Sequence, residues 1–297
     1  MKKTLKYAIL ISAIVFSLCV FLLLGGSIIA YKAIAEEQPN SNLSYLQTMK
    51  MIVAQNFEDD FTGNVKDSFL QEDYHHVSIY YEKDFTELLP ITKETLELAF
   101  AKTEVLFGKI KQEPIDFLVF ESIEEMNNLP GSVNDTAFYS ESDKMFAINY
   151  VDKELLMERD KYSLYLFQGV ILHEYTHYAF ARKAKEPSIY PLWFQEGLSV
   201  YVEDEGQGTL LLESKHIPFD QLTTNEQWQE ARHLVSTNNY AQSYYAIDFL
   251  INKYGENVIS DLMDSANETK DFGKSFKKVT GITISELDRA YLKAYKN

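Results

Sequence analysis

The chain has almost no cysteine and a clear deficit of positive charge. Its 297 residues include one cysteine, Cys19, so no disulfide can form within the chain. This excludes a small secreted fold held together by disulfides. Only 28 Lys and Arg residues stand against 44 Asp and Glu residues, which leaves a formal net charge of −16. Such a charge disfavours nucleic acid as a partner, because phosphate backbones are bound mainly by basic side chains.

The N-terminus combines a basic start with a long uncharged segment. Residues 1–6 contain three lysines, and residues 7–31 contain no charged side chain. A segment of that length can span a hydrocarbon core. We therefore expect a cytoplasmic N-terminus at 1–6, a transmembrane signal anchor at 7–31 and an extracytoplasmic remainder. A cleaved signal peptide is the alternative, because residues 33–35 (AIA) resemble a small-x-small cleavage site.

The remainder predicts a linker with a poorly assigned segment at 32–70 and one α+β domain at 71–297. An exported domain without disulfides fits a bacterial protein in the cell membrane better than a small secreted eukaryotic one. Alternation and apolar runs predict strands at 77–81 and 115–120 and a hairpin of 136–139 with 145–150. Helical spacing predicts helices at 91–109, 122–128, 162–182, 191–203, 240–254, 256–266, 272–279 and 285–295. A small mixed sheet should therefore precede a helical C-terminal part.

The segment 162–182 (YSLYLFQGVILHEYTHYAFAR) is apolar on nearly every side of a helix, and Glu174 is its only charge before Arg182. A buried carboxylate beside two imidazoles needs partners. His173 and His177 are four residues apart, which puts them within about 40° on one helix face. Two neutral imidazoles one turn apart can bind one zinc ion, and Glu174 beside them can deprotonate a bound water. The alternative is a buried helix with two hydrogen-bonded structural histidines.

A second stretch, 191–203 (PLWFQEGLSVYVE), supplies a further carboxylate. Glu196 follows His177 after 18 intervening residues, which allows one helix to end and another to return beside it. Glu196 could then be the third ligand and leave a fourth tetrahedral position open, as in catalytic zinc sites. Gly197 weakens a helix by about 1 kcal/mol relative to Ala, so we expect a close backbone approach there. The alternative for Glu196 is a solvated surface carboxylate.

These two segments resemble the gluzincin clan of zinc metallopeptidases. HEYTH at 173–177 and WFQEGLSVYVE at 193–203 are similar to the helices of small peptidase-MA-like domains and, more distantly, of M1 aminopeptidases. The resemblance extends from about residue 115 to the C-terminus. It implies a zincin-like fold with one Zn²⁺ per chain. The implied roles are metal ligation by His173, His177 and Glu196, general base catalysis by Glu174, and orientation of a ligand histidine by Glu203.

The resemblance also implies a tyrosine that stabilises the tetrahedral oxyanion from the start of a downstream helix. Tyr240 occupies the matching place, although Gln242 and Ser243 stand where the family has Lys-Gly. Tyr244 and Tyr245 are rivals for this role. Two further histidines, His216 and His233, could also reach the site, although lone histidines are usually structural.

In the resembling enzymes, the strand before the zinc helix forms a sheet edge to which an extended substrate pairs. This suggests Met145, Ala147 and Asn149 as the substrate edge, with an ordinary core strand as the alternative. The Gly-x-Met-Glu-Asn motif by which M1 aminopeptidases hold a free amine is absent. The sequence therefore favours a membrane-anchored zinc endopeptidase acting on peptides or proteins, with no preference for an oligomeric state. A catalytically inactive peptidase-like binding domain is the second hypothesis, and a structural anchor protein without metal is the third.

Overall fold

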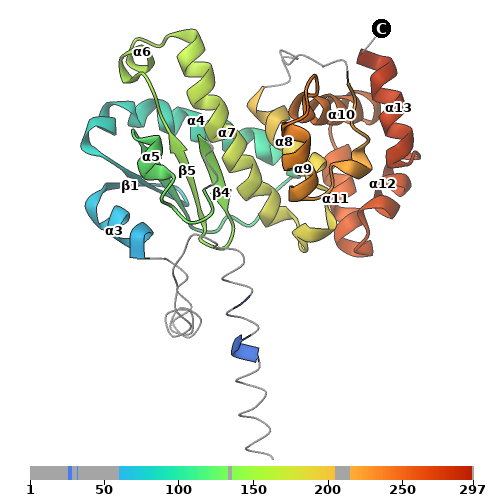
Figure 1. Ribbon diagram of the computed structural model, residues 1–297, viewed down its shortest axis with the longest axis horizontal. Coiled ribbons are helices and arrows are strands. Elements are labelled where there is room, and N and C mark those ends of the chain that lie inside the picture. The colour runs from blue at the N-terminus through green and yellow to red at the C-terminus, as the bar shows by residue number, and fades with distance from the viewer. Residues whose placement is uncertain (1–25, 29–31, 33–59, 133–135, 205–214, 296–297) are drawn as a thin grey trace, which may run out of the picture. The chain divides into compact units, whose positions relative to one another are not determined.

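The computed structural model describes residues 26–28, 32, 60–132, 136–204 and 215–295 (Figure 1). The chain divides into two compact units, one of residues 1–68 with 127–134 and one of residues 69–126 with 135–297. The first unit contains α3 (Asp60–Ser68), in a segment left unassigned from sequence. The expected anchor at 7–31 lies almost entirely outside the described residues. Among the described residues, no helix is both long and apolar enough to span a membrane.

The second unit contains a five-stranded mixed sheet in the order β1-β2-β3-β5-β4. Its strands are β1 (Leu70–Tyr74), β2 (Val77–Tyr81), β3 (Ile115–Phe120), β4 (Ala137–Ser140) and β5 (Met145–Asn149). The three central strands run parallel, and β1 and β4 are antiparallel to their neighbours. The predictions of β2, β3 and the β4–β5 hairpin are confirmed. Strand β1 was missed because its residues, LQEDY, are mostly polar and exposed.

The substrate edge expected at Met145, Ala147 and Asn149 is wrong. These residues form β5, which pairs with β3 on one side and with β4 on the other, so both of its backbone edges are occupied. Met145 and Ala147 are fully buried. The apolar sequence of β5 favours an inner position, and the tight hairpin then places β4 outside it. Among the described strands, the outermost one on this side of the sheet is therefore β4.

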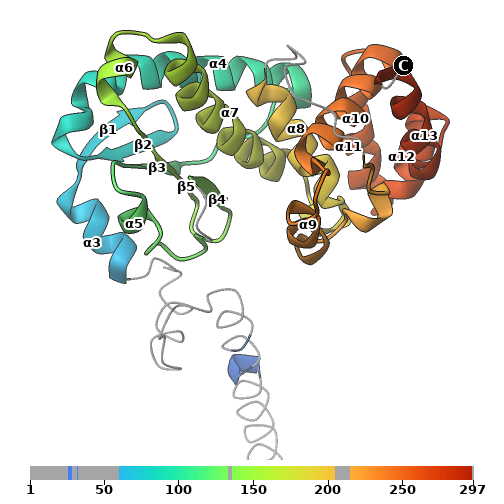
Figure 2. The same ribbon diagram turned by 45° about the horizontal axis from the view of Figure 1, so that its top comes forward.

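Two long helices pack together beside the sheet (Figure 2). They are α4 (Leu89–Phe107) and α7 (Lys161–Lys183), and α7 also contacts β4 and β5. Two short helices complete this part, α5 (Ile123–Met126) against β3 and β5, and α6 (Lys153–Met157) before α7. Apolar side chains of α4, α6 and α7 share one hydrophobic core with the sheet.

The C-terminal part is helical, as predicted. Its helices are α8 (Leu192–Glu203), α9 (Asn225–Arg232), α10 (Asn239–Tyr254), α11 (Val258–Thr269), α12 (Phe272–Thr280) and α13 (Ile284–Tyr295). Helix α8 packs against both α7 and α10, and Figure 1 shows α7 and α8 between the sheet and the remaining C-terminal helices. For each helix that the sequence predicted, the observed ends lie within about three residues of the predicted ends, which is the usual uncertainty of helix boundaries.

Candidate metal centre

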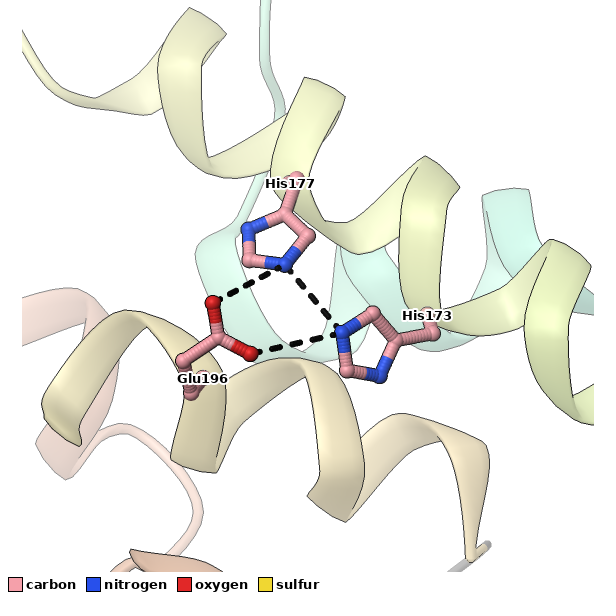
Figure 3. Close-up of side chains that lie close together, drawn as sticks. All are labelled: His173, His177 and Glu196. Carbon is pink, nitrogen blue, oxygen red and sulfur yellow. Dashed lines mark hydrogen bonds and ion pairs between the residues drawn. The ribbon is translucent and has the colours of Figure 1, made fainter. Parts of the chain in front are cut away.

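Helix α7 carries two of the candidate ligands on one face. Asp160 caps its first turn by accepting a hydrogen bond from the backbone N–H of Ser163 at 3.0 Å. Arg182 and Lys183 lie in its last turn, where positive charge complements the helix dipole. Buried side chains surround much of the helix and fix its rotation. His173 and His177 therefore point together towards α8 (Figure 3).

Helix α8 supplies Glu196 from the opposite side. A Cβ atom at Gly197 would lie 2.8 Å from the carbonyl oxygen of Ser243, so only glycine allows α8 to approach α10 this closely. The close backbone approach expected at Gly197 is confirmed. Glu196 is 15% exposed, and the rival interpretation of a solvated surface carboxylate is wrong. Its two carboxylate oxygens face the two imidazoles (Figure 3).

The three donor groups have the spacing of a tetrahedral metal site. His173 Nε2 lies 3.2 Å from His177 Nε2 and 3.5 Å from Glu196 Oε2, and His177 Nε2 lies 3.7 Å from Glu196 Oε1. Metal–ligand bonds of about 2.0–2.1 Å at tetrahedral angles hold neighbouring donors about 3.3–3.4 Å apart. Two imidazoles and a carboxylate with these separations therefore fit one metal ion, and they form a candidate metal-binding cluster among the described residues.

Glu203, in the last turn of α8, contacts one of the two histidines. His173 Nδ1 lies 2.8 Å from Glu203 Oε2. When Nδ1–H donates to this carboxylate, the Nε2 lone pair of His173 is left to face the other donors. Gly169 makes room for the contact, because a Cβ there would lie 3.2 Å from Glu203 Cγ. The importance of Gly169 was missed from sequence, although a glycine inside a buried helix was a usable signal.

The carboxylates shape the protonation of both histidines. Burial disfavours the charged form of His173, but Glu196, Glu203 and Glu174 outweigh it and raise the pKa of His173 well above its usual value. Burial, together with the nearby His173, lowers the pKa of His177 to about 4, although Glu196 acts in the opposite direction. Burial alone would raise the pKa of Glu196, but the two histidines lower it overall. Glu196 is therefore a carboxylate at neutral pH.

Glu174 is buried beside this cluster. Its exposed fraction is 7%, and its negative charge contributes to the raised pKa of His173. On an α-helix it points about 100° away from His173, so it flanks the donor triangle without belonging to it. A carboxylate in that position can take up and release a proton next to a metal-activated group.

The pKa of Tyr240, one of the three candidate tyrosines, responds to the cluster. Burial and the charge of Glu196 raise its pKa, while hydrogen bonding by Trp228 and the positive charges of Arg232 and His173 oppose this. Tyr244 is 1% exposed and stacks on Tyr201 at 5.9 Å between ring centroids.

The remaining rivals lie elsewhere. Tyr245 packs against Tyr295 of α13, with ring centroids 4.8 Å apart. His216 Nδ1 lies 2.7 Å from the hydroxyl of Tyr291, also on α13, and its Nε2 lies 3.1 Å from Asp288 Oδ1. His233 is exposed at the end of α9. None of these side chains joins the metal-binding cluster of the described residues.

The edge strand β4 is tied to the metal helix at two points. The ring of Tyr139 stacks on His177, with centroids 6.4 Å apart and an interplanar angle of 7°. Glu141, just after β4, forms an ion pair with Arg182 of α7 and accepts a hydrogen bond from Tyr139. Arg182 Nη1 also lies 2.8 Å from Glu113 Oε2. Sequence reasoning missed this network because it joins Arg182 to residues 41 and 69 positions earlier in the chain.

Comparison with known proteins agrees with the site. The family model described as Peptidase MA superfamily matches residues 96–297. The chain therefore belongs to the peptidase MA superfamily, and the resemblance inferred from the two helices is confirmed. The chain is also 36% identical over 235 residues to the uncharacterized protein YhcO of Bacillus subtilis (strain 168), a match that covers 78% of this chain and 71% of that protein.

Proposed function

We propose that this protein is a zinc-dependent endopeptidase. The observation that carries the proposal is the donor triangle of His173, His177 and Glu196, with separations of 3.2–3.7 Å and a buried Glu174 beside it. A purely structural zinc site would use four protein ligands, whereas three protein ligands leave room for a reacting group. Family membership supports a peptidase-like activity.

Each residue of the cluster has a distinct task in this proposal. Zinc supplies Lewis-acid chemistry that polarises a carbonyl group and acidifies water. Glu203 holds His173 in the tautomer that presents Nε2. Glu174 accepts a proton from the attacking water and returns it to the leaving amine. Tyr240 donates a hydrogen bond to the oxygen that becomes negatively charged as the amide is attacked.

The outer edge of β4, the outermost of the described strands on this side of the sheet, is the proposed binding site for the substrate backbone. An extended peptide can add to an exposed sheet edge through main-chain hydrogen bonds. Tyr139 of this strand stacks on His177, so a peptide paired with β4 passes beside the donor triangle. Pairing of an extended segment along β4 suits an internal peptide bond, and the sequence lacks the Gly-x-Met-Glu-Asn motif by which M1 aminopeptidases hold a free amine. Both points favour an endopeptidase.

We also propose that the domain acts outside the cell membrane, tethered by residues 7–31. The three lysines of residues 1–6 and the uncharged segment after them support this topology. Protease added to intact cells should then degrade the domain. Protection of the domain until the membrane is lysed would reverse the proposed orientation.

The activity is tested by measuring zinc content and peptide turnover side by side. Wild type should hold one zinc per chain and cleave an unstructured protein such as casein. His173→Ala and Glu196→Gln should weaken or abolish zinc binding, whereas Glu174→Gln should retain zinc and lose about 10²–10⁴-fold in turnover. His233→Ala is the matched control, since His233 is exposed and outside the donor cluster.

Each result separates the hypotheses. A wild-type rate in Glu174→Gln would assign the activity to another site or to a contaminating protease. Zinc binding without turnover in wild type would favour the peptidase-like binding domain. Absence of zinc from wild type, after purification without chelators, would overturn the metal assignment.

A further inference from the structure

The face of α7 that carries His173 continues as exposed apolar side chains towards the helix N-terminus. Leu166 and Tyr162 precede His173 by seven and eleven residues, so both point within about 20° of its direction. Leu166 is 44% exposed and Tyr162 is 70% exposed. Neither side chain is among the buried residues that form the hydrophobic core.

Contacts on either side show that this face lies between α8 and β4. Gly169 and Tyr165 point about 40° and 80° to one side of His173. Both meet α8 or the residue after it, because the Gly169 backbone borders Glu203 and the Tyr165 hydroxyl lies 3.2 Å from Asp204 Oδ1. His177 points about 40° to the other side, where Tyr139 of β4 stacks on it. Leu166 and Tyr162 therefore lie on the same face of α7 as the metal ligands, a face bordered by the contacts with α8 and with β4.

The edge strand runs in the same direction as α7. Tyr139 lies level with His177, and Glu141 lies level with Arg182, where the ion pair forms. Two residues of strand advance about 6.8 Å, and five residues of helix advance about 7.5 Å, so the two contact points match. A peptide paired with the outer edge of β4 consequently runs along α7, and its continuation beyond β4 passes Leu166 and then Tyr162.

We propose that Leu166 and Tyr162 form an extended apolar subsite for the peptide substrate. Relative to a metal between His173 and His177, they lie about 10–14 Å and 16–20 Å along the helix axis. An extended peptide advances about 3.3 Å per residue, so these distances correspond to substrate positions three to four and five to six residues from the cleaved bond. The substrate class is therefore a peptide with apolar side chains at these positions on one side of that bond. This inference rests on the proposed endopeptidase function.

The test uses two series of peptides. The long peptides carry either Leu or Ser at the positions three to six residues from the cleaved bond. The short peptides end before those positions. Wild type should prefer the apolar long peptide. Leu166→Ser and Tyr162→Ser should raise the KM for the apolar long peptide about five- to tenfold and leave kcat nearly unchanged. The kinetic constants for the short peptides should stay at the wild-type values. Val105→Ser is the control, because Val105 is 68% exposed but lies on α4. Binding of the same peptides to zinc-loaded Glu174→Gln provides a readout without turnover.

The outcomes distinguish this inference from the proposed function. Cleavage without an apolar preference, or equal effects of Leu166→Ser and Val105→Ser, would overturn the subsite and leave the endopeptidase standing. A protein that cleaves nothing but binds the apolar peptide in a Leu166-dependent manner would overturn the endopeptidase and keep the subsite. Absence of both cleavage and Leu166-dependent binding would overturn both.

Discussion

Glu203 on α8 reaches His173 on α7 through the space left by Gly169. The carboxylate oxygen Oε2 lies 2.8 Å from His173 Nδ1, and a Cβ at Gly169 would lie 3.2 Å from Glu203 Cγ. The missing side chain, one turn before the histidine, is thus part of how the ligand is oriented. Residues that orient a metal ligand commonly contribute 10–100-fold to metal affinity.

Weakening this contact should lower zinc affinity without removing a ligand. Glu203→Gln is expected to weaken zinc binding about 10–100-fold, measured by competition with a chelator. Gly169→Ala should have a smaller effect of the same sign, although alanine favours the helix by about 1 kcal/mol. Because both changes act on one contact, their effects on affinity should not add in the double variant. Independent, additive effects would show that Gly169 does not act through Glu203.

Gly197→Ala should destabilise the fold at the contact between α8 and α10. The new Cβ would lie 2.8 Å from the Ser243 carbonyl oxygen and 2.9 Å from Ile247 Cγ1, and the backbone oxygen cannot rotate away. Overpacking of this kind costs about 1–3 kcal/mol, which should appear as a lower free energy of unfolding. Gly63→Ala is the control, because a Cβ there meets nothing within 4 Å. Equal stability of the two variants would contradict the close approach.

The stability of the fold should fall in acid partly because of His76. This side chain stacks on Tyr178, with ring centroids 5.5 Å apart, and burial lowers its pKa to about 4, helped by His75. The unfolded chain takes up the proton near pH 6.5 and the folded chain only near 4, so stability present above pH 6.5 is lost progressively as the pH falls between these values. A pKa shift of this size corresponds to about 3 kcal/mol in the free energy of unfolding. Because His76 is partly exposed, solvent screening reduces the expected loss of stability to roughly 1–2 kcal/mol.

The measurement is urea unfolding at pH 7 and pH 4.5 for wild type and His76→Gln. The glutamine variant should lose less stability between these two values, because it has no group to protonate at this position. His233→Gln, at an exposed side chain at the end of α9, is the control and should follow wild type. Identical losses in wild type and His76→Gln would assign the acid sensitivity to other groups.

Tyr240→Phe should lower turnover while zinc content stays at the wild-type level. The phenol would act on charge that develops during attack, so kcat should fall by about 10²-fold or more and KM should change little. Tyr245→Phe is the matched control, because its ring packs on Tyr295 of α13. Steady-state kinetics on one peptide compare the two. A larger loss in Tyr245→Phe would show that the oxyanion donor had been assigned to the wrong tyrosine.

The sequence by itself was enough to predict the two helices of the metal centre. A spacing of four residues places His173 and His177 on one helix face whatever surrounds them, because the α-helix is a local structure with a constant period. Glu174 follows from the same geometry. The 18 residues between His177 and Glu196 allow the chain to return, and the resemblance to gluzincins indicates Glu196 as the candidate third ligand. Local periodicity likewise predicted β2, β3 and most helix boundaries.

Only the tertiary structure decided which strand lies at the sheet edge and which side chains reach the site. Strand order depends on pairing between segments far apart in the chain, so the hairpin sequence could not show that β4 lies outside β5. The same holds for the room that Gly169 leaves for Glu203 and for the stacking of Tyr139 on His177. A helix period fixes the direction of a side chain on its own helix. What that side chain meets there depends on the packing of the whole domain.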